Sequence, residues 1–286
     1  MLPAQLNAYL PYVRKPLEIT RNFRRWRSAE RVHTPFVFIL GPGRSGTTLL
    51  DRLLLNHSRM RGFPIQTKIF SARPIHDYAR FQHFLTRDVF DRALAESGSL
   101  AGFLSAIHTL TFDLPEGGYF VEKTPEHAIH LAYLMDRFPA ARFVFALRDP
   151  RDAFCSGRKD GFIPQASAIP GYLDYLGATV RPMLDLSENE KTRLHVVRYE
   201  EFTRSPLAEM QRLMGFLGLP GEEERQLAPT APTEDWRAKD KQFARLAEPV
   251  SATTVGRWRD QLGKDEQAAF HQRGGKLLRQ LGYSID

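Results

Sequence analysis

A glycine-rich turn between an apolar segment and a helical pattern constrains this chain more than any other feature. The apolar, β-favouring segment Phe36–Leu40 leads into Gly41-Pro-Gly-Arg-Ser-Gly-Thr-Thr48, and leucines at helical spacing follow. Glycines let the backbone approach a ligand closely, and the first N–H groups of a helix point toward an anion. A strand, a glycine-rich turn and a helix in this order therefore predict a phosphate-binding loop.

One position of this loop departs from the pattern of ATP- and GTP-hydrolysing enzymes. Those enzymes carry a lysine after the second fixed glycine, where its ammonium group reaches the β- and γ-phosphates. This chain has Thr47 at that position and carries a cation earlier in the turn, at Arg44. The difference favours a phosphate-bearing nucleotide other than ATP or GTP. A P-loop kinase that uses ATP is the first alternative, with Asp149 as its only Walker-B-like candidate.

Alternating strand and helix patterns predict the fold class. Strands are expected over residues 36–40, 119–123, 142–147 and 194–197. Helices are expected over residues 49–55, 100–110, 128–138, 207–217 and 265–281, the last interrupted at Gly274–Gly275, and a surface loop over 221–241. Such βαβ units imply a parallel sheet covered on both faces. We expect one three-layer α/β domain of P-loop architecture over residues 35–286, preceded by a basic arm over residues 1–34.

Composition restricts the partners and the compartment. The chain has a net charge of +7, which suits nucleic acid, an anionic surface or a polyanionic small molecule. No zinc-finger spacing or RNP-like motif is present, so we expect no nucleic-acid partner, although a basic binding protein is the second alternative. No apolar segment approaches the ~20 residues of a membrane span. We expect a cytoplasmic protein, since its single Cys155 suits a reducing compartment, with peripheral contact to an acidic membrane as a minority alternative.

A second basic feature follows another predicted strand. Arg148 leaves the strand over residues 142–147, and Ser156 lies two turns along the helix that begins near Pro150. If this helix lies beside the first loop, a guanidinium group and a hydroxyl group can hold a further phosphate. Taken alone, the pattern also fits an N-capped helix with a surface ion pair. Together, the two features suit a nucleotide with a 5′-phosphate anhydride and a separate ribose phosphate.

Five segments in chain order resemble those of the sulfotransferases that use 3′-phosphoadenosine-5′-phosphosulfate (PAPS). Residues 43–48 look like the family's 5′-phosphosulfate loop, and Arg148 with Ser156 looks like its 3′-phosphate pair. Residues 122–125 look like the Glu-Lys-Thr segment of its carbohydrate-type, tyrosyl-protein and related bacterial branches. Residues 197–202 are similar to its Tyr-Glu segment, and residues 254–259 to its late Gly-x-Trp-basic element. The resemblance extends from about residue 36 to residue 262.

The resemblance implies a reaction and a set of site residues. The reaction is metal-independent, in-line transfer of a sulfuryl group from PAPS to an acceptor hydroxyl, leaving adenosine 3′,5′-bisphosphate (PAP). Arg44 would take up charge on the 5′-phosphate, and Lys123 would approach the bridging oxygen, because such transfer depends on positioning and charge neutralisation. The implied cofactor contacts are Gly43, Arg44, Ser45, Gly46, Thr47, Thr48, Arg148, Ser156, Tyr199, Ser251 and Arg257.

The general base is where the chain departs from the family. Relatives carry a glutamate shortly after the first helix, and the matching residue here is Gln66. An amide cannot accept the acceptor's proton. Three explanations compete. The segment is misaligned with the family, another group such as His76, His127 or Glu122 acts as the base, or the acceptor needs little assistance from a base. A protein that binds PAPS but transfers poorly is a further alternative.

The acceptor is the part of the reaction that the sequence defines least. Small-molecule, carbohydrate, lipid-linked, phenolic and peptide acceptors all stay open, and the oligomeric state is not predicted. Aromatic residues between the first helix and Glu122 could line an apolar acceptor pocket, although we expect most of them in the core: Phe63, Phe70, Tyr78, Phe81, Phe84 and Phe90.

Overall fold

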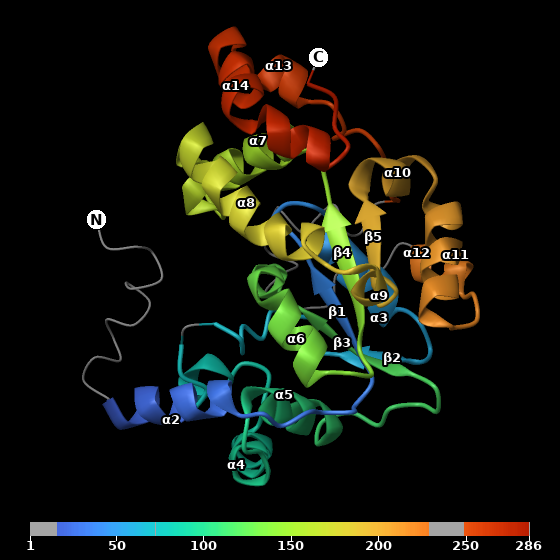
Figure 1. Ribbon diagram of the computed structural model, residues 1–286. Helices are drawn as coiled ribbons and strands as arrows, with labels where there is room; N and C mark the ends of the chain where they lie inside the picture. The colour runs from blue at the N-terminus through green and yellow to red at the C-terminus, as the bar shows by residue number, and fades with distance from the viewer. Residues whose placement is uncertain (1–15, 72, 229–248, 286) are drawn as a thin grey trace.

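A five-stranded parallel sheet forms the centre of the molecule (Figure 1). The structure is a computed structural model that describes residues 16–71, 73–228 and 249–285. The sheet has the order β2-β3-β1-β4-β5, and every neighbouring pair of strands is parallel. The strands are β1 (Phe36–Leu40), β2 (Met60–Gly62), β3 (Tyr119–Lys123), β4 (Arg142–Leu147) and β5 (Leu194–Arg198). The predicted strands are confirmed, and the short edge strand β2 was not predicted.

Helices cover both faces of this sheet, so the predicted α/β class is confirmed (Figure 1). Short 3-10 helices occupy η2 (Tyr78–Arg80), η3 (Pro125–His130) and η4 (Pro164–Ser167). The α-helices are α2 (Pro16–Arg27), α3 (Thr47–Leu55), α4 (Arg87–Glu96), α5 (Leu100–Thr109), α6 (Leu131–Arg137), α7 (Pro150–Asp160), α8 (Ile169–Leu184), α9 (Glu188–Lys191), α10 (Tyr199–Arg204), α11 (Pro206–Leu217), α12 (Glu223–Leu227), α13 (Trp258–Gln261) and α14 (Lys264–Gln280).

The two sides of β1 contribute to two different clusters of the core. Phe36 and Phe38 pack on one face with residues of α5 and α6, and Phe38 stacks on Phe143 of β4 with ring centroids 5.4 Å apart. Val37 and Ile39 pack on the other face with residues of α3 and α11. Because all of β1 is buried, its sequence is a continuous apolar run rather than an alternating one. The loop after β1 is therefore anchored from both sides.

Three sequence predictions differ from the structure. The helix expected from residue 128 begins as η3 and becomes α-helical only at Leu131. The predicted break at Gly274–Gly275 is wrong, because α14 continues through both residues. A Cβ atom on Gly274 would lie 2.9 Å from Leu173, so the glycine permits close packing on α8 rather than ending a helix. The loop expected over residues 221–241 contains α12, and its part beyond residue 228 lies outside the described residues.

The aromatic residues between α3 and β3 belong mainly to the core, as expected. Phe63, Phe70, Phe81 and Phe90 are each less than 5% exposed. The other two, Tyr78 and Phe84, are partly buried against the same cluster. These rings therefore stabilise the layer of helices beside β3.

The described part of the predicted basic arm, residues 16–34, forms α2 and packs against the domain. The guanidinium group of Arg25 donates hydrogen bonds to the carbonyl oxygens of Ser97, at 2.6 Å, and Leu94, at 2.9 Å. Trp26 stacks on Tyr133 with ring centroids 5.2 Å apart. The boundary between arm and domain stays a prediction, and residues 1–15 lie outside the described part. Across the described ranges, no helix has the length and apolar character that a membrane crossing requires.

Candidate active site

The predicted phosphate-binding loop connects β1 to α3 at the carboxyl edge of the sheet. Gly46 has φ +90° and forms the N-cap of α3 without a side chain to occupy the first N–H groups. A Cβ atom at this position would lie 2.8 Å from the ring of Tyr199, so only glycine allows this approach. Arg44 also adopts a left-handed conformation, with φ +68°. The loop thus presents the uncapped start of a helix, a favourable position for an anion.

Four segments that are distant in sequence line one pocket of about 560 Å³ beside this loop. They are the start of α3, the end of β4 with α7, the start of α10, and residues 249–257. The predicted cofactor residues that line the pocket are Arg44, Gly46, Thr47, Thr48, Arg148, Ser156, Tyr199, Ser251 and Arg257. The other two lie behind it: the N–H group of Gly43 donates to the hydroxyl group of Tyr175 at 2.8 Å, and Ser45 is buried.

Arg148 lies between the loop, Tyr199 and the 249–257 segment. Its guanidinium group donates to the carbonyl oxygens of Thr254, at 2.7 Å, and Arg44, at 3.3 Å. The guanidinium carbon lies 4.5 Å from the centroid of the Tyr199 ring. Its Nε atom is buried and has no hydrogen-bond partner among the described residues. An unmet buried N–H group of a cation costs free energy, so this arginine is suited to an anionic ligand.

Arg44 occupies the α7 side of the pocket. Its Nε atom donates to the hydroxyl group of Ser156 at 3.0 Å, and its Nη2 atom lies 2.6 Å from a carboxylate oxygen of Asp160. The structure therefore places Arg44 in contact with the serine that the sequence assigned to the other phosphate. Asp160 was not predicted, although its position one turn beyond Ser156 on α7 is a signal that could have identified it.

Asp152, which was also not predicted, holds the 249–257 segment at the side of the pocket. Its carboxylate accepts hydrogen bonds from the N–H groups of Gly256, at 2.7 Å, and Trp258, at 2.9 Å. The guanidinium carbon of Arg151 lies 3.8 Å from the centroid of the Trp258 ring. These contacts hold the 249–257 segment against α7. The Gly-x-Trp pattern indicated this segment, but nothing in it identified an acidic partner on α7.

Lys123 ends β3 and is buried rather than solvated. Its Nζ atom lies 4.0 Å from a carboxylate oxygen of Asp51 on α3, and both side chains are nearly inaccessible. A buried ammonium group needs a balancing charge, which Asp51 supplies. Because Ile39 of β1 pairs with Lys123, the lysine lies at the same sheet edge as the phosphate-binding loop.

Glu122 points into the opposite side of the sheet and is held by two hydroxyl groups. Its Oε1 atom accepts hydrogen bonds from Thr124, at 2.6 Å, and Thr67, at 3.0 Å. Burial raises the pKa of Glu122 to about 7, although these hydrogen bonds and Lys123 oppose the shift. Near neutral pH the carboxyl group therefore exists in both protonation states.

The other candidate bases lie in different surroundings, and the Nδ1 atom of His127 is 3.5 Å from the Oε1 atom of Glu122. The Nε2 atom of His127 accepts the N–H group of Phe70 at 3.2 Å, and burial lowers the pKa of His127 well below its ordinary value. His76 is half-buried near Arg21 and Arg25 of α2, and burial and these cations lower its pKa. Gln66 is exposed. Gln66, Glu122 and Lys123 do not line the pocket of about 560 Å³.

A comparison with protein families decides the assignment. The model of the sulfotransferase family matches residues 35–224, which is more than half of the chain. This chain belongs to the sulfotransferase family. It is a transferase enzyme, and the predicted family is confirmed. A search among curated proteins finds no match.

Solved structures share the fold of this sulfotransferase at low sequence identity. The sulfotransferase domain of the olefin synthase from Synechococcus PCC 7002 is 17% identical, with a TM-score of 0.69 over 91% of this chain and 99% of that one. The sulfotransferase domain from the curacin biosynthetic pathway is 17% identical, with a TM-score of 0.61 over 90% and 100%. Mouse sulfotransferase SULT7A1, crystallised in complex with PAP, is 10% identical, with a TM-score of 0.53 over 92% and 90%.

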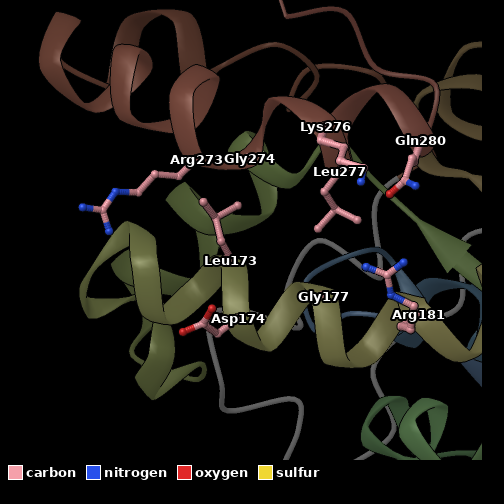
Figure 2. A pocket seen from close by; sticks show the side chains of 9 residues that line it. All are labelled: Leu173, Asp174, Gly177, Arg181, Arg273, Gly274, Lys276, Leu277 and Gln280. Carbon is pink, nitrogen blue, oxygen red and sulfur yellow. The ribbon is translucent and has the colours of Figure 1, made fainter.

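A second hollow of the sulfotransferase lies away from these residues, between α8 and α14 (Figure 2). Leu173 and Leu277 approach each other across it, and Arg181 extends toward the side of Gln280. None of the predicted site residues lines this hollow. The pocket of about 560 Å³ is therefore the candidate active site.

Proposed function

We propose that this sulfotransferase moves a sulfuryl group from PAPS to an acceptor hydroxyl group and releases PAP. The observation that carries the proposal is the single pocket that joins the start of α3 to Arg148 and Ser156. A helix start and a separate arginine–serine pair provide two anion sites, as a nucleotide with 5′- and 3′-phosphates requires. The complex of mouse SULT7A1 with PAP supports the same ligand class on a shared fold.

The residues present fit this nucleotide. The N–H groups and hydroxyl groups of Thr47 and Thr48 would hold the 5′ end, where no side chain caps the helix. The Nε atom of Arg148, which has no partner among the described residues, would join Ser156 and Arg257 at the 3′-phosphate. The ring of Tyr199, which lines the same pocket, would contact the adenine.

Two cations would stabilise the charge that develops during transfer. When bound, PAPS supplies an activated sulfuryl group whose bond to the 5′-phosphate oxygen breaks as the acceptor oxygen attacks. Arg44 would neutralise charge on the 5′-phosphate after leaving its contact with Asp160, and Lys123 would approach the bridging oxygen. Fixed cations of this kind supply the charge that a metal ion supplies in phosphoryl transfer, so the proposed reaction needs none.

Glu122 acts in this proposal as a positioning residue. Its hydrogen bonds from Thr67 and Thr124 connect the 66–68 segment to the end of β3, directly beside Lys123. Its burial makes it unsuited to direct proton transfer with an acceptor. Because Gln66 replaces the expected carboxylate, we infer slow transfer to unactivated alcohols and faster transfer to acidic hydroxyl groups such as phenols. The second candidate function is a nucleotide-binding protein with weak transfer activity. Gln66 favours it, because an amide cannot act as the base.

Release of PAP from PAPS tests the proposal directly. The protein is incubated with PAPS and a panel of phenols, sugars and aliphatic alcohols, and PAP and sulfated products are measured by mass spectrometry. The buffer contains a reducing agent, because the chain has a single cysteine. We expect PAP release that depends on the acceptor and is lost in Lys123→Ala. Transfer of phosphate from ATP without use of PAPS would replace the proposal with the kinase alternative.

A further inference from the structure

Helix α2 exposes an unusual set of side chains. Leu17 is 72% exposed and Phe23 is 59% exposed, which makes them the two most exposed large apolar side chains among the described residues. Asn22, a polar residue on the same helix, is only 7% exposed. A surface helix in water normally buries its large apolar residues and exposes its polar ones. The orientation of α2 reverses this pattern at three positions.

Polar contacts hold α2 in this orientation. The side-chain oxygen of Asn22 accepts the N–H group of Ile75 at 3.0 Å. The guanidinium group of Arg25 donates to the carbonyl oxygens of Leu94 in α4, at 2.9 Å, and of Ser97 directly after α4, at 2.6 Å. Trp26 packs edge-on to His130 with ring centroids 4.8 Å apart, on the same inward side. The outward direction of Leu17 and Phe23 is therefore fixed by specific contacts rather than by the absence of packing.

The outward side of α2 is also basic. Arg21, Arg24 and Arg27 are exposed between and beside the two apolar residues, and the guanidinium carbon of Arg27 lies 5.6 Å from the centroid of the Phe23 ring. The only acidic residue of the helix, Glu18, is partly buried. α2 lies at the periphery of the molecule (Figure 1). Exposed apolar residues among arginines, without exposed acids, complement an anionic bilayer, where rings enter the interface and arginines contact headgroups.

We propose that the outward face of α2, formed by Leu17, Thr20, Arg21, Phe23, Arg24 and Arg27, docks on an anionic membrane surface. This face is connected to the end of β3 through a short chain of contacts. Trp26 contacts Phe70, and Phe70 belongs to the segment whose Thr67 and Lys68 hydrogen-bond Glu122 and Thr124. Docking would therefore leave the 66–70 segment on the inward side of α2, joined to the docked face through the helix itself.

Vesicle flotation with the full chain tests this proposal. We expect binding to vesicles of mixed phosphatidylcholine and phosphatidylglycerol, little binding to phosphatidylcholine alone, and weaker binding as salt is raised. The double variant Leu17→Ser/Phe23→Ser should bind at least tenfold more weakly. Arg21→Gln/Arg24→Gln should bind vesicles about 25-fold more weakly, since each basic residue near an anionic surface contributes about fivefold.

Matched variants on other faces provide the control. Leu207 is 51% exposed on α11, and Arg204 and Arg279 are exposed elsewhere. Leu207→Ser and Arg204→Gln/Arg279→Gln should bind vesicles like the unmodified protein, and all variants should keep its thermal midpoint. Equal losses in these controls, or no binding by the unmodified protein, would overturn the proposal. A concentration-dependent dimer that Phe23→Ser abolishes would assign the face to a second copy of the chain instead.

Discussion

The proposed nucleotide site is a pocket lined by four distant segments, whereas the end of β3 is a closed cluster of buried polar groups. In the pocket, Arg148 and Ser156 present donors to a cavity of about 560 Å³. At the end of β3, Glu122 and Lys123 are at most 4% exposed and bind neighbours in the fold. The comparison suggests a division of roles in the proposed reaction, in which most pocket residues bind the nucleotide and Lys123, together with Arg44 of the pocket, supports the transfer step. Changes in the pocket should alter nucleotide affinity, and changes at the end of β3 should alter turnover.

The largest expected effect comes from Lys123→Ala. Loss of a preorganised cation at the leaving oxygen should lower kcat by about 10²- to 10³-fold, as removal of a single stabilising donor does in other enzymes. The dissociation constant for PAP, measured by calorimetry, should change by less than about threefold. The matched control Lys68→Ala, at an exposed lysine of the neighbouring segment, should keep kcat. Equal losses of PAP affinity and of kcat in Lys123→Ala would contradict the proposal that Lys123 acts in transfer rather than in nucleotide binding.

Arg148→Ala should have the next largest effect, on affinity. A charge-assisted hydrogen bond contributes about 1.5–3 kcal/mol, so PAP should bind roughly 10- to 150-fold more weakly. Binding of adenosine 5′-monophosphate, which has no 3′-phosphate, should hardly change. Arg158→Ala removes an exposed arginine of α7 that pairs with Glu266, and serves as the control. If the binding of both nucleotides weakens to the same extent, Arg148 stabilises the pocket and does not bind the 3′-phosphate.

Glu122→Gln should change how stability depends on pH. The folded protein keeps the Glu122 proton up to about pH 7, whereas an unperturbed glutamate loses it near 4.5. The group's contribution to the free energy of unfolding therefore falls as pH rises from about 4.5 to 7, and is level above that. Denaturant unfolding should show Glu122→Gln gaining about 1–3 kcal/mol relative to the unmodified protein across this range. A constant difference at all pH values would mean that folding does not shift the pKa of Glu122.

The smallest expected effect is a gain from Gln66→Glu. A carboxylate at this exposed position would supply the base that the family segment normally contains. We expect kcat with an aliphatic alcohol to rise by about three- to tenfold, and kcat with a phenol to change little, because a phenol loses its proton more readily. Gln66→Asn, which stays neutral, should give no gain. An unchanged rate with both acceptors would show that residue 66 does not face the acceptor.

The sequence was sufficient for every strand of the sheet except β2, for the loop and for most of the pocket, because these depend on local signals. Buried strands give continuous apolar runs, and a strand–glycine–helix order specifies the phosphate loop. Long-range contacts gave no such signal. The pairing of Asp152 with the N–H groups of Gly256 and Trp258 joins residues that are 104 and 106 positions apart. The contact of Asp160 with Arg44, 116 positions earlier, was also not predicted, although the place of Asp160 one turn beyond Ser156 on α7 could have indicated it.

Glycine patterns were the least reliable local signal. Gly46 was correctly taken as a tight turn, because a left-handed residue is needed where the chain enters α3. Gly274 was wrongly taken as a helix break, because the same residue type also allows two helices to approach closely. The direction of Lys123 could not be predicted either. Its burial beside Asp51 depends on how α3 packs on β3, which no spacing in the sequence specifies.

Calorimetric titration with PAP, ADP and ATP–Mg²⁺ tests the central claim most directly. If one pocket binds both a 5′- and a 3′-phosphate, PAP should bind at least tenfold more tightly than ADP, which lacks the 3′-phosphate. ATP–Mg²⁺ should bind no better than ADP. Equal or tighter binding of ATP–Mg²⁺ would contradict the two-phosphate account of the pocket.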